Sequence, residues 1–175
     1  MRLNVGAGAT ALPQYLNVDI SAYHGVGVIC DVEHIPFKDR AFEAVAARDL
    51  LHHVGDPERA IGEMWRVTEN EMEVWESNRR NPYMWTRMIF SGFAHDHFTP
   101  RKFRRLFIGY PAFFDRANNF EHFVGFERAS RKRLSSFIMR LYRMASAVVP
   151  SYNVAYLRRR GGPAPQGRPG APWRE

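Results

Sequence analysis

The stretch Leu-Asn-Val-Gly-Ala-Gly, residues 3–8, decides the fold of this 175-residue chain. Residues 2–5 are short and half apolar, and a glycine stops them at once, as in a buried strand that runs into a tight backbone turn. A glycine has no side chain to fill the space beside such a turn, so the backbone can approach a ligand closely. The stretch therefore predicts a ligand site at the end of the first strand.

The rest of the chain alternates between strand and helix patterns. Further strands are expected at residues 15–20, 25–32, 44–48, 72–76 and 154–157. Asp56-Pro57 and Thr99-Pro100 each place a capping residue before a proline, which predicts that helices begin there. Strands alternating with helices predict a mostly parallel sheet covered on both faces, and ligands bind such sheets at the carboxyl ends of the strands.

Two acidic residues end predicted strands and suggest the type of ligand. Asp19 can accept hydrogen bonds from two ribose hydroxyls, and Asp31 can accept one from an adenine amino group. About a dozen residues separate Gly6 from Asp19, fewer than the ~20 of a dinucleotide-binding fingerprint, and no Gly-Lys-Ser/Thr motif follows. The residues thus favour an adenosine ligand without phosphates. A helix cap or a solvated loop carboxylate is the alternative role of each acid.

Five stretches, in this order and spacing, resemble the small class I methyltransferases of type 11, and the resemblance runs from Arg2 to about Arg160. They are residues 3–8, Leu-Asn-Val-Asp-Ile (16–20), Asp-Val-Glu-His-Ile-Pro-Phe (31–37), Phe-Glu-Ala-Val (42–45) and Leu-Leu-His-His-Val-Gly-Asp-Pro-Glu-Arg-Ala (50–60). The resemblance implies an α/β, Rossmann-like fold: a doubly wound, mostly parallel sheet of about seven strands, the last antiparallel, with helices on both faces. It also implies S-adenosylmethionine as the cofactor and methyl transfer as the activity.

The same resemblance assigns cofactor contacts to the ends of the first four strands. The implied cofactor-binding residues are Asn4, Gly6, Ala7, Gly8, Asp19, Ile20, Asp31, Val32, Arg48, Asp49 and Leu50. Asn4 stands where many methyltransferases have an acid, and residues 68–71 replace the family's Pro-Gly-Gly turn before the fifth strand. The crossover between the first two strands leaves room for a helix of only about one turn.

The acceptor side is expected beyond the fifth strand, where Asn78 and Arg79 are the candidate substrate contacts and His97 is a candidate catalytic base. His53 is a second catalytic candidate, with orientation of its loop by hydrogen bonding as the alternative. A base is needed only when the acceptor must lose a proton. No metal is expected, because His95, Asp96, His97 and the His52-His53 pair lack the ligand spacing of a metal site.

Charge divides the chain into two unlike parts. Residues 1–100 hold nine Lys and Arg against fourteen Asp and Glu, whereas residues 101–175 hold sixteen against four. A basic end suggests contact with a phospholipid surface, a phosphorylated substrate or nucleic acid, with a solvated tail as the alternative. Nucleic acid is disfavoured, because the aromatic residues of the basic part fall on apolar helical stripes.

The chain is expected to form one domain over residues 1–160, with an acceptor-side insertion at about 77–110, a basic amphipathic helix at about 130–149 and a disordered tail at 161–175. Without a long apolar run or a signal peptide, the pattern predicts a cytoplasmic protein, with peripheral contact to an anionic membrane as an option. The function expected is methyl transfer to a small-molecule or lipid-like acceptor. A catalytically degenerate, methyltransferase-like binding module is the alternative.

Overall fold

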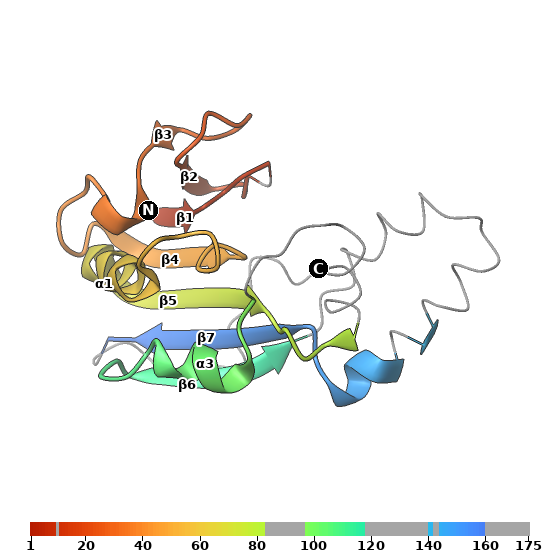
Figure 1. Cartoon of the computed structure of the whole chain (residues 1–175). Helices are drawn as coiled ribbons and strands as arrows, with labels where there is room; N and C mark the ends of the chain where they lie inside the picture. Colours follow the sequence, from red (N-terminus) through yellow and green to blue (C-terminus); the bar gives the residue numbers. More distant parts are fainter. Residues whose placement is uncertain (10, 83–96, 118–139, 142–143, 160–175) are drawn as a thin grey trace.

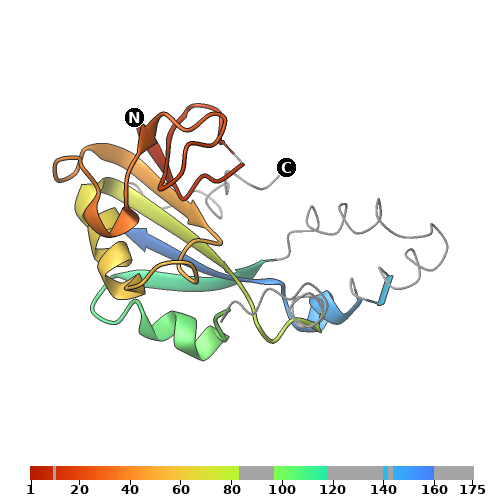
Figure 2. The same ribbon diagram turned by 45° about the horizontal axis from the view of Figure 1, so that its top comes forward.

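A computed structural model of the chain describes residues 1–9, 11–82, 97–117, 140–141 and 144–159 and forms one seven-stranded sheet (Figures 1 and 2). Its strands are β1 (Arg2–Val5), β2 (Tyr15–Asp19), β3 (Val28–Ile29), β4 (Phe42–Arg48), β5 (Thr68–Ser77), β6 (Ala112–Ala117) and β7 (Tyr152–Arg158). They lie in the order β3-β2-β1-β4-β5-β7-β6. Strands β1 to β5 are parallel, and β7 is antiparallel to both of its neighbours. The predicted mostly parallel sheet with an antiparallel last strand is thereby confirmed.

The helices begin where the cap-plus-proline pattern predicts. The Asp56 carboxylate accepts a hydrogen bond from the Arg59 amide at the start of α1 (Pro57–Val67). The Thr99 hydroxyl does the same for the Lys102 amide at the start of α3 (Pro100–Arg105). Each cap satisfies an amide that has no partner within the helix.

One face of the sheet carries the main core. Alternate strand residues point to this face, and they pack against buried side chains of α1, of α3 and its following turn, and of the short 3-10 helix η1 (Val32–His34). The strand residues are Leu3, Val5, Val45, Ala47, Met72, Val74, Ala155 and Leu157. On the other face, Trp75, Tyr152 and Val154 form a second, smaller cluster.

Four local features of the structure differ from what the sequence predicts. The strand expected over residues 25–32 is reduced to β3, and its last part becomes η1, because the Asp31 carboxylate caps that helix by accepting from the Glu33 amide. Between β1 and β2 the described residues form turns instead of a helix. No turn precedes β5: α1 ends at Val67, and β5 begins at Thr68. The sequence did not predict β6.

The helix after Thr99 is shorter than its apolar stripe suggested. The amides of residues 106–108 bond to the carbonyls three positions earlier, so the last turn tightens into 3-10 geometry. Several expectations fall outside the described residues: His95, Asp96, most of the helix at 130–149 and the tail at 161–175. Residues 140, 141 and 144–148 of that helix are helical. No helix within the described ranges is long and apolar enough to cross a membrane.

Candidate cofactor pocket and acceptor-side cluster

A pocket opens at the carboxyl ends of β1 to β4, the edge at which ligands of parallel sheets bind. It is lined by Val5, Gly6, Val18, Asp19, Ile20, Cys30, Asp31, Val32, Glu33, Leu50, His53, Val54 and Gly55. The strand ends named from the sequence therefore do meet in space. Cys30, only half-buried, belongs to this lining, and burial raises the pKa of its thiol.

The glycine turn after β1 has a conformation that other residues rarely adopt. Gly6 and Gly8 have φ angles of 66° and 52°. A Cβ on Gly6 would lie 2.6 Å from Leu50 Cδ1, a distance that real Cβ contacts do not show. A Cβ on Gly8 would meet nothing within 4 Å and would project into open space. The turn thus packs tightly against Leu50 and leaves a bare backbone beside the pocket.

Asp19 ends β2 and ties two pocket walls together. One carboxylate oxygen accepts from the Gly8 amide (2.9 Å) and the other from the Ser21 amide (3.0 Å). Each oxygen has a further lone pair. The half-buried Asp19 carboxylate can therefore hold the glycine turn and still accept hydrogen bonds from a ligand hydroxyl.

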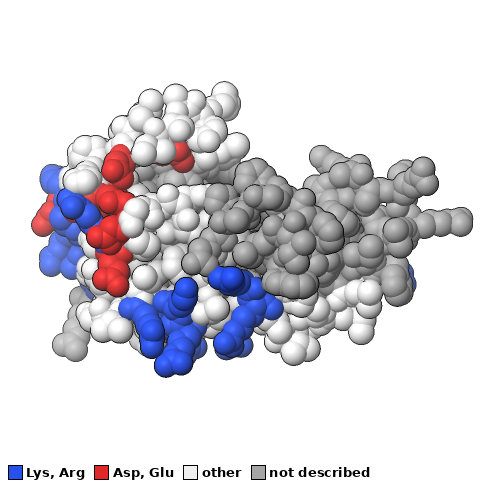
Figure 3. All heavy atoms as spheres, in the orientation of Figure 1, with Lys and Arg blue, Asp and Glu red and all other residues white. Residues whose placement is uncertain are grey.

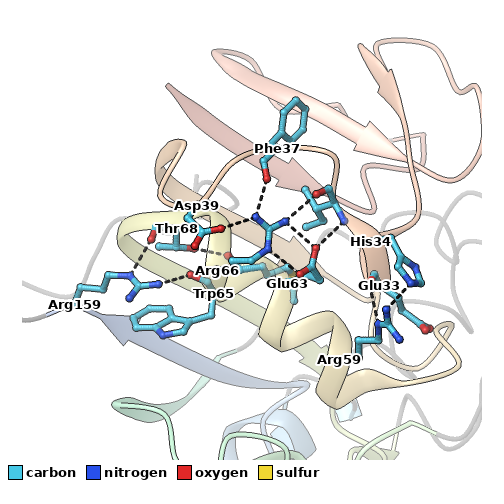
Figure 4. Close-up of polar contacts among 12 residues, drawn as sticks. Glu33, His34, Phe37, Asp39, Arg59, Glu63, Trp65, Arg66, Thr68 and Arg159 are labelled. Atoms are coloured by element: carbon cyan, nitrogen blue, oxygen red, sulfur yellow. Dashed lines mark hydrogen bonds and ion pairs between the residues drawn. The ribbon is translucent and has the colours of Figure 1, made fainter.

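The wall that follows β3 is fastened to α1 (Figure 4). Glu33 accepts from the Asp56 amide through its side chain (2.9 Å), and its carbonyl accepts from Arg59 Nε (3.1 Å). Arg59 also contacts the His34 ring. Because Asp31 and Glu33 both line the pocket, the start of α1 positions this wall.

Arg66 fastens the continuation of that wall. Its guanidinium donates to the carbonyls of Ile35 (2.9 Å) and Phe37 (2.7 Å) and pairs with Asp39 and Glu63, as Figure 4 shows. The hydrogen bond from Arg66 is the main reason that the pKa of Glu63 is lowered. An arginine that satisfies two carbonyls holds an irregular segment that no sheet partner orders.

Other sequence-predicted cofactor residues lie outside the pocket lining: Asn4, Ala7, Gly8, Arg48 and Asp49. The buried Asn4 amide donates to Asn17 Oδ1 (2.8 Å), and Asn17 also bonds the backbone of Leu12. Asn4 thereby braces the short crossover between β1 and β2. Ala7 is buried, and Arg48 ends β4 opposite Trp75 of β5.

Asp49 turns the chain sharply after β4. Its φ of 52° lies in the left-handed region, which aspartate tolerates better than most residues. Its Oδ1 accepts from the Ser77 amide (3.2 Å) and hydroxyl (2.6 Å), and its Oδ2 accepts from the Tyr152 hydroxyl (2.7 Å). Burial and the Asp49 charge raise the pKa of Tyr152 well above 10, so the phenol stays a donor.

Glu76, which sequence reasoning did not select, holds the loop after β4. This fully buried carboxylate accepts from the Leu50 amide (2.8 Å), the Leu51 amide (2.5 Å) and His52 Nδ1 (2.8 Å). Burial raises the pKa of Glu76, because it penalises the charged form. Burial of the His52 ring opposes its charge, but the hydrogen bond to Glu76 and the nearby carboxylates outweigh burial and raise the pKa of His52 above 6.5.

Two further histidines lie beside the His52 ring on the acceptor side. The His52 ring lies 4.0 Å from the His53 ring and 4.5 Å from the His97 ring, measured between centroids. The structure thus brings the two predicted catalytic histidines together through His52, which the sequence analysis did not choose. An acid near the end of a strand, directly after apolar residues, as Glu76 is in β5, was the signal that could have pointed to this cluster.

Asp49, His52 and Glu76 also offer metal-ligand atoms that all lie within 4.8 Å of one another. Their carboxylate oxygens, however, already accept hydrogen bonds from backbone amides, a hydroxyl, a phenol and an imidazole. A metal ion would have to displace these donors. The donor set fits a closed hydrogen-bond cluster better than a metal site.

The two predicted substrate contacts follow β5. Asn78 is buried: its amide donates to the Pro150 carbonyl (2.9 Å) and its Oδ1 accepts from the Arg80 amide. Arg79 is exposed, and its backbone amide bonds the Phe98 carbonyl. Asn78 therefore shapes this loop, whereas Arg79 presents its side chain at the surface.

The fold is similar to the folds of several solved methyltransferases. A methyltransferase from Thermotoga maritima, described as a possible histamine N-methyltransferase, has a TM-score of 0.63 and 16% identity, over 90% of this chain and 81% of that one. The geranyl diphosphate C-methyltransferase of Streptomyces coelicolor was crystallised with Mg²⁺, geranyl diphosphate and S-adenosylhomocysteine. It has a TM-score of 0.60 and 15% identity, over 90% of this chain and 71% of that one. A methyltransferase from Archaeoglobus fulgidus has a TM-score of 0.61 and 11% identity, over 90% of this chain and 85% of that one.

The sequence itself matches the methyltransferase domain family of type 11 over residues 3–72. The matched residues contain all five stretches that resemble this family, and they make up less than half of the chain. The family's cofactor is S-adenosylmethionine, and its activity is methyl transfer from it. The match does not favour a degenerate binding module. Among curated proteins, no sequence matches this chain.

Proposed function

We propose that this chain transfers the methyl group of S-adenosylmethionine to a small, lipid-like acceptor that enters beside the histidine cluster. The observation that carries the proposal is the juxtaposition of two features at one sheet edge. A pocket with acids at the ends of β2 and β3 adjoins, through the neighbouring residues His52 and His53, a buried carboxylate–histidine pair.

The pocket residues fit the cofactor by their chemistry. Asp19 has the lone pairs to accept two ribose hydroxyls, and Asp31 can accept the adenine amine. The glycine turn offers bare backbone for the methionyl part, since no side chain fills the space beside Gly8. Ile20, Val32 and Leu50 supply the apolar surface around the adenosine.

When bound, S-adenosylmethionine supplies a methyl group on a sulfonium, and the electron pair of the broken S–C bond stays on sulfur as an acceptor lone pair takes the methyl carbon. The protein's main contribution is to align the acceptor and to exclude water. Where the acceptor is a hydroxyl, its proton must pass to a base. We assign that role to His97 or His53, with His52 and Glu76 holding their surroundings in place.

The lipid-like character of the acceptor is inferred from the setting of the site. Arg79 lies exposed beside it, and exposed apolar side chains lie on the helix that packs on the same loop. A geranyl diphosphate methyltransferase with the same fold acts on an amphiphile of this kind. An acceptor with an apolar body and a polar or anionic end matches these surroundings.

Radiolabelled methyl transfer tests the proposal. The purified protein, incubated with labelled S-adenosylmethionine and a panel of prenyl, phenolic and acyl-chain acceptors, is expected to label an organic-extractable product. His97→Ala and His53→Ala should then lower kcat more than they weaken cofactor binding. Label found only in water-soluble amines would contradict the lipid-like acceptor while leaving the methyltransferase activity intact.

A further inference from the structure

The last described helix presents its apolar side to water. Leu141, Met144 and Val148 expose 49%, 70% and 79% of their surface. Met144 and Val148 are four residues apart and therefore lie on one side of this helix, and Leu141 belongs to the helical residues 140–141 that precede it in the sequence. The opposite side faces protein, because the buried Ser146 hydroxyl accepts a hydrogen bond from Asn81 (3.0 Å). An ordinary surface helix has the reverse orientation, with its apolar stripe toward the core.

A basic group lies on α3. Arg101, Arg104 and Arg105 are exposed, and α3 contains no acidic residue. Its apolar side is occupied, since Phe103 is buried against the rings of Phe107 and Phe114. Figure 3 shows a group of basic side chains over α3 without acidic ones among them, whereas the acidic side chains visible on this face lie near α1 and over the β2 and β3 end of the sheet.

The two groups lie at the same edge of the sheet, because both helices are connected to the loop after β5. Asn81 of this loop bonds Ser146 and the Val149 carbonyl of the last helix. The Arg79 amide bonds the Phe98 carbonyl, directly before the cap of α3. Figures 1 and 2 show both helices on the β6 and β7 side of the sheet. Ile108, which is 78% exposed, adds a further apolar side chain after α3.

We propose that this surface, with Arg101, Arg104 and Arg105 as its basic part and Leu141, Met144 and Val148 as its apolar part, docks on a bilayer that contains anionic lipids. Basic side chains beside an exposed apolar stripe match such a bilayer, whose surface is negative and whose interior is apolar. A protein partner would need shape complementarity, which three separate exposed side chains do not supply. The inference rests on the proposed lipid-like acceptor, since docking brings the acceptor-side loop to the membrane.

Vesicle co-sedimentation tests the docking surface on the full chain. We expect binding to phosphatidylcholine vesicles that contain one third phosphatidylglycerol, weakened by high salt, and little binding to phosphatidylcholine alone. Arg101→Ala with Arg105→Ala should weaken binding by about fivefold per arginine. Met144→Ser with Val148→Ser should weaken it by about tenfold per side chain.

Two matched variants serve as controls. Phe113→Ser removes a side chain that is 73% exposed but points to the opposite face from its neighbour Phe114, which packs on α3. Lys38→Glu reverses an exposed charge in the segment next to α1. Both should bind vesicles as the unaltered chain does.

Several outcomes would overturn the docking surface. These are equal binding by the surface variants and the controls, equal binding to neutral vesicles, or a dimer in light scattering that Met144→Ser with Val148→Ser dissociates. Calorimetric titration of the same variants with S-adenosylmethionine separates this proposal from the proposed function. If the surface variants still bind the cofactor and also bind vesicles as the unaltered chain does, docking is refuted and the proposed function is not. If the unaltered chain fails to bind the cofactor, the proposed function is refuted.

Discussion

Replacement of Glu76 by alanine should destabilise the protein and loosen the cofactor pocket together. The buried carboxylate accepts hydrogen bonds from the Leu50 and Leu51 amides and from His52 Nδ1. Without it, two amides near the core lose their acceptor, and each unsatisfied group costs about 1–3 kcal/mol. We therefore expect the free energy of unfolding to fall by about 2–6 kcal/mol. Because Leu50 lines the pocket, affinity for S-adenosylmethionine should fall as well.

Urea denaturation followed by circular dichroism measures the first effect, and calorimetric titration measures the second. Glu76→Gln is the informative comparison, because its side-chain carbonyl can still accept from both amides while the charge is lost. It should retain most of the stability that Glu76→Ala loses. Glu71→Ala removes an exposed carboxylate from the same strand and should change stability by no more than about 0.5 kcal/mol. A loss below about 1 kcal/mol for Glu76→Ala would refute the reasoning.

Four further predictions follow from single contacts. Gly6→Ala forces an alanine into a positive φ and against Leu50, so it should lower the free energy of unfolding by about 1–2 kcal/mol and weaken cofactor binding. Unchanged binding in calorimetric titration would speak against the tight turn. Asp19→Ala should weaken S-adenosylmethionine binding at least about tenfold, as the loss of one charge-assisted hydrogen bond requires. Arg66→Leu removes the hydrogen bonds to the Ile35 and Phe37 carbonyls and should lower the free energy of unfolding by about 1–3 kcal/mol. The urea midpoint should fall accordingly, and an unchanged midpoint would contradict this. Because the pKa of His52 is raised in the folded protein, His52 keeps a proton there that the unfolded chain releases above about pH 6.5. The free energy of unfolding should therefore fall as pH rises from about 6.5 through the raised pKa. A series of urea denaturations at different pH values measures this slope, and Glu76→Gln should flatten it.

The parts of the fold that local chemistry determines could be predicted from the sequence. Asp56-Pro57 and Thr99-Pro100 mark helix starts because capping and the fixed φ of proline act within one turn. The strands β1 and β2 end where Gly6 and Asp19 stand, since glycine and a strand-end acid interrupt the apolar pattern. These same residues meet at the pocket, because parallel strands share one carboxyl edge.

Strands that depend on distant partners could not be predicted in this way. The first residues of β5 are polar, yet they are strand because Thr68 pairs with Phe42 and Glu71 with Arg158. Strand β6, which contains Asp115 and Arg116, has no local strand pattern and exists through its antiparallel pairing with β7. Pairing over long sequence separations overrides weak local propensity.

The acceptor-side cluster shows the same limit at the level of side chains. The sequence contains His52 and His53 side by side, and no pattern indicates which ring meets a carboxylate. The structure pairs His52 with Glu76 and leaves His53 at the pocket. The positive φ of Asp49 sets this arrangement by turning the chain after β4. That conformation depends on Ser77 and Tyr152, which lie 28 and 103 residues away.

The most direct test of the central claim is calorimetric titration of the purified chain with S-adenosylmethionine, with S-adenosylhomocysteine and NAD as comparisons. We expect binding of the first two in the micromolar range, no binding of NAD, and at least about tenfold weaker binding of S-adenosylmethionine by Asp19→Ala. Absence of binding by a folded protein, or equal binding of NAD, would contradict the assignment of the pocket to an adenosine cofactor without phosphates.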